Sequence, residues 1–497
     1  MTKHTISKSQ YVKGLQCPKA LWLYRHRKDL APEITPDKQA LFDTGHEIGE
    51  LAMQYFGDGV EVTNKYWDVK GAMESTRQYI KDGHDLIFEA TAIHPIDGSY
   101  ARIDILKRVP GSDEWDLIEV KSSTSVKDYH IDDMSFQYHV FYGAGYKIRK
   151  CFMMLIDNQY VRDGDIDPNQ LLKLEEISVA VFAKQGEVDA VAGQLGYVLE
   201  RKAEPSVSIG ARCFAPFECD YKDHCWAHVP DYSVYDVFPK SKAEDISRQH
   251  GVDIEKLPEH IRPTGIKAVD VQSYLEGETL VNAQAISSFL KQIEYPIYYL
   301  DYETIMPAIP MFDDTRPFQQ IPFQFSVHVQ HEPGGELTHH EFLHKDRSDP
   351  RRNFAEKLVE LCGDKGTVLV YNQSFEIARN KELAQDFPEY ADAIQAINAR
   401  VVDLLEPFKQ RWLYHPNQHS SASIKAVLPC FTDLSYKDLE ISNGGEAMLQ
   451  YKDFIAGKIP ENQLDDLWQN LSTYCEQDTY AMVLLLDVLM KEKENEL

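Results

Sequence analysis

The sequence contains no apolar run long enough to cross a membrane and no low-complexity tract. A membrane-spanning helix needs about 18 or more uncharged apolar residues in succession. The start of the chain also lacks the apolar core of a secretory signal. These absences predict a soluble, cytoplasmic protein without a membrane partner, and 497 residues allow about three domains of ordinary size.

Positive charge is scarce as well. The chain carries 52 basic and 79 acidic residues, which gives a net charge of −27. Passive nucleic-acid binders are normally basic, so this balance argues against that class. It does not exclude a nuclease, because catalytic carboxylates add negative charge that metal ions neutralise in use.

Cysteine is sparse and unevenly distributed. Of the 8 cysteines, Cys213, Cys219 and Cys225 lie close together, whereas Cys17 lies far upstream. In a cytoplasmic chain, a group of this kind indicates a bound metal or cofactor rather than disulfides.

Two apolar segments of the first half carry charged residues where strands are expected to end. Residues 101–107 and 116–121 are predicted to form neighbouring strands of a hairpin. Asp104 lies on the first strand, while Glu119 and Lys121 share one face of the second because they are two residues apart. The two carboxylates would hold a metal ion, with the lysine beside the attacking water or the scissile phosphate.

This pattern resembles the RecB-like branch of the PD-(D/E)XK nucleases. The segment from Gln137 to Phe141 is similar to the Q-x-x-x-Y helix of that branch, so the resemblance implies that Gln137 contacts the substrate backbone. It also implies Mg²⁺ or Mn²⁺ at Asp104 and Glu119. One position departs from the pattern, because Gly49 stands where many relatives have a metal-binding histidine.

The cysteines resemble the one-plus-three arrangement of the iron–sulfur members of the same branch. The resemblance implies a [4Fe–4S] cluster, for which four thiolates are the usual complement. A tetrahedral zinc site is the alternative, although its cysteines usually come in pairs two to four residues apart. The implied ligands are Cys17, Cys213, Cys219 and Cys225.

The second half is organised around residues 296–304, a short apolar strand that carries two carboxylates. Asp301 and Glu303 are two apart on this strand and therefore point the same way. Two adjacent carboxylates repel each other unless a cation binds them, and oxygen ligands suit magnesium and manganese. The sequence then predicts three antiparallel strands, a helix, a strand and a second helix.

That order is typical of the start of a ribonuclease-H-like fold, and the residues resemble the DEDD exonucleases. Asn372-x-x-Phe375-Glu376 is similar to the N-x-x-F-D element of that family, with glutamate replacing the aspartate. Tyr474 precedes Asp478 by four residues, as in the tyrosine subclass. The resemblance implies two cations held by four carboxylates and a water molecule positioned by Tyr474; the four are Asp301, Glu303, Glu376 and Asp478.

The whole chain is therefore expected to be an α/β protein of two domains joined by a helical connector. The expected ranges are 1–230 for the RecB-like domain, 231–288 for the connector and 289–497 for the ribonuclease-H-like domain. Over its length the chain resembles an uncharacterised bacterial family that joins these two domains. The expected function is phosphodiester hydrolysis of DNA or RNA, including 3′–5′ exonuclease activity. A nucleic-acid-binding scaffold with degenerate sites and an iron–sulfur redox sensor are the alternatives.

Overall fold

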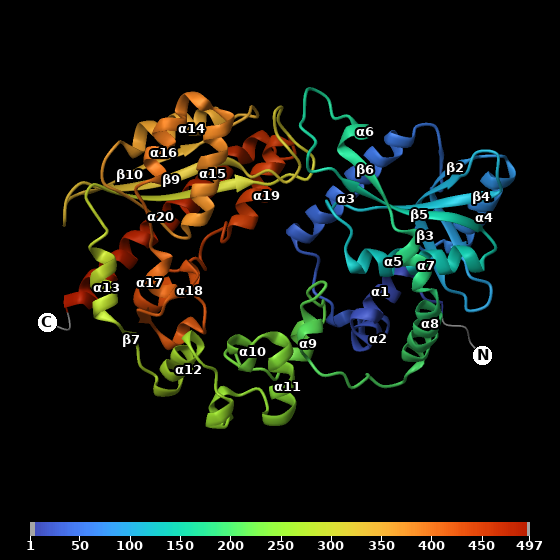
Figure 1. Cartoon of the computed structure of the whole chain (residues 1–497), viewed down its shortest axis with the longest axis horizontal. Helices are drawn as coiled ribbons and strands as arrows, with labels where there is room; N and C mark the ends of the chain where they lie inside the picture. The colour runs from blue at the N-terminus through green and yellow to red at the C-terminus, as the bar shows by residue number, and fades with distance from the viewer. Residues whose placement is uncertain (1–4, 495–497) are drawn as a thin grey trace. The chain divides into compact units, whose positions relative to one another are not determined.

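The computed structural model describes residues 5–494, which form two compact units (Figure 1). The first contains the described residues up to His228 together with Ala308–Phe318. The second contains Val229–Pro307 and the described residues from Gln319 onward, so residues 231–288 belong to it. The predicted α/β class is confirmed by the mixture of helices and several sheets. Within the described part, no helix is long and apolar enough to span a bilayer.

The first unit is built on a six-stranded sheet whose strands lie in sequence order. β1 is parallel to β2 and β4 is parallel to β5, while the other neighbours are antiparallel. Helix α5 (Asp128–Gly143) makes the crossover that a parallel β4–β5 pair requires. The strands are β1 (Val60–Glu61), β2 (Leu86–Ile93), β3 (Tyr100–Arg108), β4 (Glu114–Val120), β5 (Lys147–Ile156) and β6 (Leu172–Glu176).

Helices cover both faces of this sheet. One apolar core joins the sheet to α1, α5 and α8, and a second joins the opposite face to α3. The helices of this unit are α1 (Lys8–Gln16), α2 (Pro18–His26), α3 (Pro36–Phe56), α4 (Val69–Lys81), α5 (Asp128–Gly143), α6 (Pro168–Leu171), α7 (Ser178–Ala183), α8 (Gln185–Glu200) and α9 (Lys222–Trp226).

Strands β2 and β3 are irregular where they face each other at Glu89 and Asp104. Phe88 packs into the α3 core but Ala90 packs into the α5 core, although residues two apart on a regular strand share a face. Glu89 itself has a φ of 57°, a left-handed conformation that is uncommon for this residue type. Irregular pairing of this kind changes the direction in which the side chains of a strand point.

A strap from the second half of the sequence, Ala308–Phe318, completes the first unit. Ala308 enters the α3 core, and both ends of the strap pack apolar side chains against it. Arg162 Nη1 donates to the carbonyls of Pro310 and Met311 at 3.0 and 2.7 Å. The Arg162 backbone also bonds to Thr315 at 3.1 Å, so the strap is held by polar and apolar contacts.

The second unit contains a five-stranded sheet in the order β10-β9-β8-β11-β12. β8, β9 and β10 are antiparallel, whereas β11 and β12 run parallel to β8. The predicted succession of three strands, helix, strand and helix is confirmed. The elements are β8 (Ile297–Ile305), β9 (Ile321–Gln330), β10 (Leu337–Leu343), α14 (Arg351–Cys362), β11 (Thr367–Val370), α15 (Gln373–Asp386), α16 (Ala391–Asn398) and β12 (Val401–Asp403).

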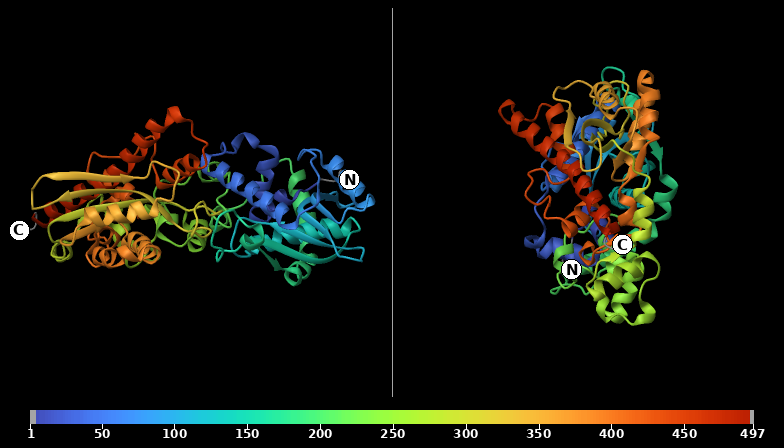
Figure 2. Two further views of the ribbon diagram at one scale, coloured as in Figure 1. Left: turned by 90° about the horizontal axis from the view of Figure 1, so that it is seen from above. Right: turned by 90° about the vertical axis from the view of Figure 1, so that its left-hand side faces the viewer.

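Alternation along β8 and β9 sorts their side chains between two layers. Leu300 and Tyr302 point into the core made with α14–α16. On β9, Ser326 and His328 point the other way and bond to Thr479 of α20. Figure 2 shows α20, in red, on the opposite side of the strands from the orange helices. The remaining elements are α17 (Leu405–Lys409), β13 (Leu413–Tyr414), α18 (Ile424–Phe431), α19 (Gly444–Ile455) and α20 (Leu464–Glu494).

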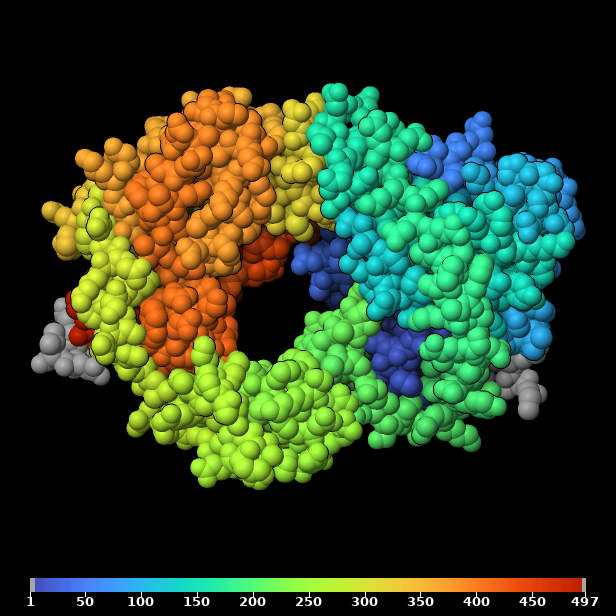
Figure 3. Space-filling model, viewed as in Figure 1, coloured from blue at the N-terminus to red at the C-terminus, as the bar shows by residue number. Residues whose placement is uncertain are grey.

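The segment predicted as a helical connector also contains a short strand. Its elements are α10 (Val234–Val237), α11 (Lys240–His250), α12 (Ile266–Glu276), β7 (Leu280–Val281) and α13 (Ala283–Leu290). β7 pairs with β13, and a buried ion pair joins Arg411 to Asp270 at 2.6 Å. Figure 3 shows the yellow-green atoms of this segment against the orange atoms of the same unit.

Candidate functional sites

The first unit gathers the charged residues predicted on β3 and β4. Ile105 pairs with Ile118, so Asp104 and Glu119 occupy the adjoining positions of the two strands. Asp104 Oδ2 accepts the backbone N–H of Val120 at 2.6 Å, and Glu119 is 1% exposed. Lys121 Nζ donates to Glu119 Oε1 at 2.7 Å. The three predicted residues therefore share one site.

Two further residues reach this site. Lys8, in the first turn of α1, donates to Glu119 Oε1 at 2.6 Å. Asp133 of α5 accepts from Lys121 at 2.8 Å. Glu119 therefore meets two ammonium groups, one of them from a residue 111 positions away in the sequence.

Gln137 is buried beside the same carboxylate. Its Nε2 donates to Glu119 Oε2 at 2.7 Å and to Asp133 Oδ1 at 3.3 Å. Its Oε1 is buried without a hydrogen-bond partner. A buried amide oxygen without a donor is costly, so Gln137 retains one open acceptor for a group that enters the site.

The pKa values of the two carboxyls of this site, Asp104 and Glu119, are shifted in opposite directions. Burial, reinforced by the charge of Glu119, raises the pKa of Asp104 above its ordinary value. Burial also raises the pKa of Glu119, but Lys121 and Lys8 together outweigh it, so this pKa is lowered. The pair thus carries its negative charge on Glu119, where the ammonium groups compensate it.

In the second unit three carboxylates converge. One oxygen of each of Asp301, Glu303 and Asp478 lies within 4.8 Å of the others. Asp301 and Glu303 are on β8 and Asp478 is on α20, which covers this face of the sheet. Glu303 and Asp478 are each 7% exposed. An acid triad of this kind offers oxygen ligands to a divalent cation.

Burial and mutual repulsion together raise the pKa values of the carboxyls at this second site. Burial, followed by the charges of Asp478, Glu303 and Glu376, raises the pKa of Asp301 well above its ordinary value. Burial and Asp478 likewise raise the pKa of Glu303. Burial raises the pKa of Asp478 as well. Without a cation, the triad holds protons that ordinary carboxyls release at neutral pH.

Glu376 lies near this triad but outside the group of atoms within 4.8 Å. It occupies the first turn of α15, is 2% exposed, and its Oε2 is buried without a partner. Burial raises its pKa to about 8. Asp403, at the end of β12, accepts the backbone N–H groups of Asn372 and Gln373 at 2.9 and 3.2 Å and so fixes the start of the helix.

Two tyrosines and a lysine border the triad. Tyr436 donates its hydroxyl to Asp478 Oδ1 at 2.6 Å. Lys425 Nζ donates to the Tyr474 hydroxyl at 3.2 Å and to the Ser442 carbonyl at 2.5 Å. Burial and the nearby carboxylates raise the pKa of Tyr474 far above its ordinary value, so this hydroxyl stays protonated.

The four predicted ligand cysteines come together in the first unit. They line one hollow with Lys19 and Tyr221, and Cys17 lies at the junction of α1 and α2. Burial raises the pKa of the Cys219 and Cys225 thiols. Among the described residues, their four sulfur atoms do not form a group of three or more within 4.8 Å of one another.

Sequence reasoning missed Lys8, Asp133 and Tyr436. Asp133 lies four residues before Gln137 and could have been found by helical spacing. Lys8 and Tyr436 carry no such signal, because each reaches its partner through the fold alone.

Comparisons with known proteins match parts of the chain. Residues 298–423 match the family described as Domain of unknown function (DUF2779). The Uncharacterized protein MG366 homolog of Mycoplasma pneumoniae is 28% identical over 205 residues, covering 38% of this chain and 31% of that protein. The Uncharacterized protein UU173 of Ureaplasma parvum is 24% identical over 292 residues, covering 53% and 42%. The matches thus span less than half the length of these relatives.

Among solved structures, the chain has a weak likeness to an alkaline exonuclease from Laribacter hongkongensis. The likeness covers 39% of this chain and 90% of that chain, with 15% sequence identity and a TM-score of 0.18.

Proposed function

We propose that the chain is a metal-dependent nuclease with two separate active sites and that DNA, RNA or both are its substrates. The observation that carries this proposal is the triad of half-buried Asp301 with buried Glu303 and Asp478, in which one oxygen of each residue lies within 4.8 Å of the others. Three carboxyls with raised pKa values in one place are costly unless a cation compensates them. Metal ions bound by carboxylates catalyse phosphodiester hydrolysis, which is a function that such a triad could serve.

In the second unit the triad would hold Mg²⁺ or Mn²⁺, with Glu376 as a fourth ligand. Such ions, when bound, supply hydroxide and stabilise the leaving 3′ oxygen. Tyr474 stays protonated and positions the attacking water by a hydrogen bond. Lys425, beside Tyr474, adds positive charge where a phosphate would lie. The order of the strands and helices supports a ribonuclease-H-like domain with 3′–5′ exonuclease activity.

In the first unit Asp104 and Glu119 would hold the cation of a RecB-like site. Lys121 contacts Glu119 and would orient the water or the phosphate. Gln137 has one open acceptor, which supports a role in binding the substrate.

The four cysteines would hold a [4Fe–4S] cluster with a structural role. The cysteines of structural zinc sites usually come in pairs two to four residues apart. The gaps between Cys213, Cys219 and Cys225 are wider, which supports the cluster over the zinc alternative.

The test is cleavage of 5′- and 3′-labelled single strands of DNA and RNA by anaerobically purified protein with Mn²⁺. We expect stepwise shortening from the 3′ end, lost in EDTA and in Asp301→Asn. Asp104→Asn should leave this shortening intact and remove a second cleavage pattern. Absence of cleavage on all four substrates refutes the nuclease, and loss of every activity through one substitution refutes two sites.

A nucleic-acid-binding scaffold is the second candidate for the first unit. The contacts of Lys8 and Lys121 with Glu119 favour this scaffold. Both ammonium groups lie beside the carboxylate, where a catalytic metal ion would have to bind. The scaffold predicts binding of labelled strands without any product that depends on Asp104.

A further inference from the structure

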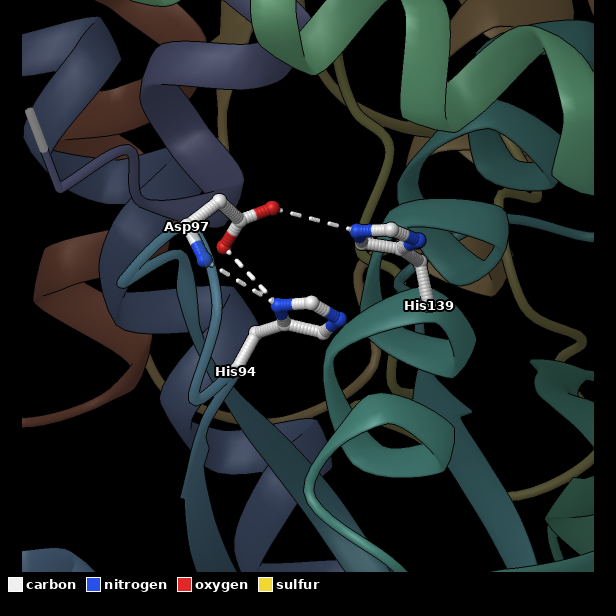
Figure 4. Close-up of side chains that lie close together, drawn as sticks. All are labelled: His94, Asp97 and His139. Carbon is white, nitrogen blue, oxygen red and sulfur yellow. Dashed lines mark hydrogen bonds and ion pairs between the residues drawn. The ribbon is translucent and has the colours of Figure 1, made fainter. Parts of the chain in front are cut away.

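We propose that His94, Asp97 and His139 form a separate Zn²⁺ site in the first unit. His94 and Asp97 lie in the turn between β2 and β3, and His139 lies on α5. Figure 4 shows the Asp97 carboxylate joined by dashed lines to one ring nitrogen of each histidine. One ligand atom of each residue lies within 4.8 Å of the other two.

The three side chains lie about as far apart as ligands of one ion, and in its absence they are joined by hydrogen bonds, including one from the Asp97 backbone N–H to His94 Nδ1. His94 Nδ1 lies 3.2 Å from Asp97 Oδ1, and His139 Nε2 lies 3.3 Å from Asp97 Oδ2. Charge-assisted hydrogen bonds are usually about 2.7–2.9 Å long. Ligands bound at about 2.0–2.2 Å in a tetrahedron around one zinc ion lie roughly 3.3–3.6 Å from one another. The observed separations are longer than the first range and reach the lower end of the second.

The turn that carries two of the ligands is held in place, and the site is open to water. Ser99 donates its backbone N–H to Asp97 Oδ1 at 2.7 Å, and His94 exchanges backbone bonds with Gly98 and Ser99, so the turn is tight. The imidazoles stack with their centroids 4.7 Å apart, so one ring must turn before both nitrogens face a common ion, because each lone pair lies in the plane of its ring. The histidine side chains are 11% exposed and that of Asp97 is 34% exposed, which lets an ion enter and keep a water ligand.

The absence of a side chain at Gly143 makes this arrangement possible. A Cβ at that position of α5 would lie 1.8 Å from Cδ2 and 2.2 Å from Nε2 of His94. The ring of His94 therefore rests on the helix one turn beyond His139. An alanine at Gly143 should displace His94 and leave all three ligand residues chemically unchanged.

The ligand chemistry selects the ion. Two imidazoles and one carboxylate with an open position suit zinc, whereas magnesium prefers oxygen ligands alone. The site would not take part in catalysis. It would join the β2–β3 turn to α5, the helix that carries Asp133 and Gln137.

The test is zinc binding by the full chain, purified anaerobically so that the proposed cluster is kept, with ZnCl₂ added and crystals measured at the zinc absorption edge. We expect an anomalous peak bounded by the three side chains in the natural protein. Gly143→Ala should lose this peak and one equivalent of zinc, with affinity at least tenfold weaker. The matched control is Gly196→Ala on α8, where an added Cβ meets nothing within 4 Å and both signals should persist.

His139→Gln provides a second variant in case Gly143→Ala fails to fold, and it should also lose one equivalent of zinc. The proposal is overturned if the natural protein shows no peak at these side chains. It is overturned equally if a folded His139→Gln protein keeps both the peak and the zinc stoichiometry. Neither result depends on nuclease activity.

Discussion

Glu119 and the triad of the second unit are buried or half-buried carboxylates, but their surroundings differ. Glu119 accepts hydrogen bonds from Lys8, Lys121 and Gln137. The triad is compensated mainly by the Tyr436 hydroxyl and by Lys425 nearby. A cation entering the first site must therefore compete with ammonium groups, whereas one entering the second replaces protons.

Lys8→Met tests this competition. The variant removes one charged hydrogen bond to Glu119, so we expect the free energy of unfolding in EDTA to fall by about 2 kcal/mol. The half-saturating Mn²⁺ concentration for the cleavage that depends on Asp104 should fall several-fold, because one competing cation is gone. The control is Lys13→Met on the same helix, which removes the contact with Asp220 instead. An unchanged Mn²⁺ dependence in Lys8→Met would contradict the competition.

His328 predicts an acid-sensitive step in stability. Burial, with His339 nearby, lowers the pKa of His328 to about 4, so the folded protein keeps this ring neutral while the unfolded chain binds a proton near pH 6.5. Between about pH 4 and 6.5 the unfolded state therefore binds more protons than the folded state. The free energy of unfolding decreases as the pH is lowered through that window. The loss should reach at most about 3 kcal/mol at the acid end.

Urea unfolding at a series of pH values measures this step. His328→Gln should flatten the dependence relative to the natural protein. The control His331→Gln, at an exposed position after β9, should leave it unchanged. Equal slopes in all three proteins would remove His328 as the cause.

At the scale of elements, the alternation rule predicted part of each site. On β8 the rule holds, and Asp301 and Glu303 reach α20 as their spacing indicates. On β2 and β3 it fails at Glu89 and Asp104, where both strands change the face they present. Such an irregularity cannot be predicted from local sequence patterns, because it depends on how the two strands pair with each other. Contacts such as Lys8 with Glu119 are beyond local patterns for the same reason.

Asp403 tests how one strand end positions a helix. Asp403→Ala removes the acceptor for the N–H groups of Asn372 and Gln373 at the start of α15. We expect a loss of about 1–2 kcal/mol of stability, as for other N-terminal caps. Because α15 carries Glu376, the proposed 3′ trimming activity should fall more than tenfold.

Chemical unfolding and a 3′-labelled strand measure the two effects. Asp392→Ala, in the exposed first turn of α16, is the matched control and should change stability by less than about 0.5 kcal/mol. If Asp403→Ala loses the expected stability but keeps its trimming activity, the position of Glu376 does not matter for that activity.

At the scale of the whole molecule, the chain contains two units with their own cores. The sequence predicted two chemistries in the two halves, and it predicted the strands that carry them. It did not predict that Ala308–Phe318 belongs with the first unit, because no pattern in that short segment indicates which unit it packs against.

The proposed iron–sulfur cluster should stabilise one unit only. Removal of iron by a chelator and an oxidant, or Cys219→Ser, should lower the melting temperature of the first unit, because metal binding contributes to folding. The transition of the second unit should stay in place. Calorimetry with limited proteolysis separates the two transitions, and Cys430→Ala in the second unit is the control. Joint movement of both transitions would contradict a local role.

The strap Ala308–Phe318 has a consequence for biosynthesis. Domains commonly fold as the nascent chain leaves the ribosome, the N-terminal part first. Here translation finishes the first sheet well before it supplies the residues that bind the Arg162 guanidinium and cover Ile156 and its neighbours. Maturation of the N-terminal unit therefore waits for the ribosome to pass residue 318, and a gene fragment that stops at residue 228 would encode a body with this apolar patch uncovered.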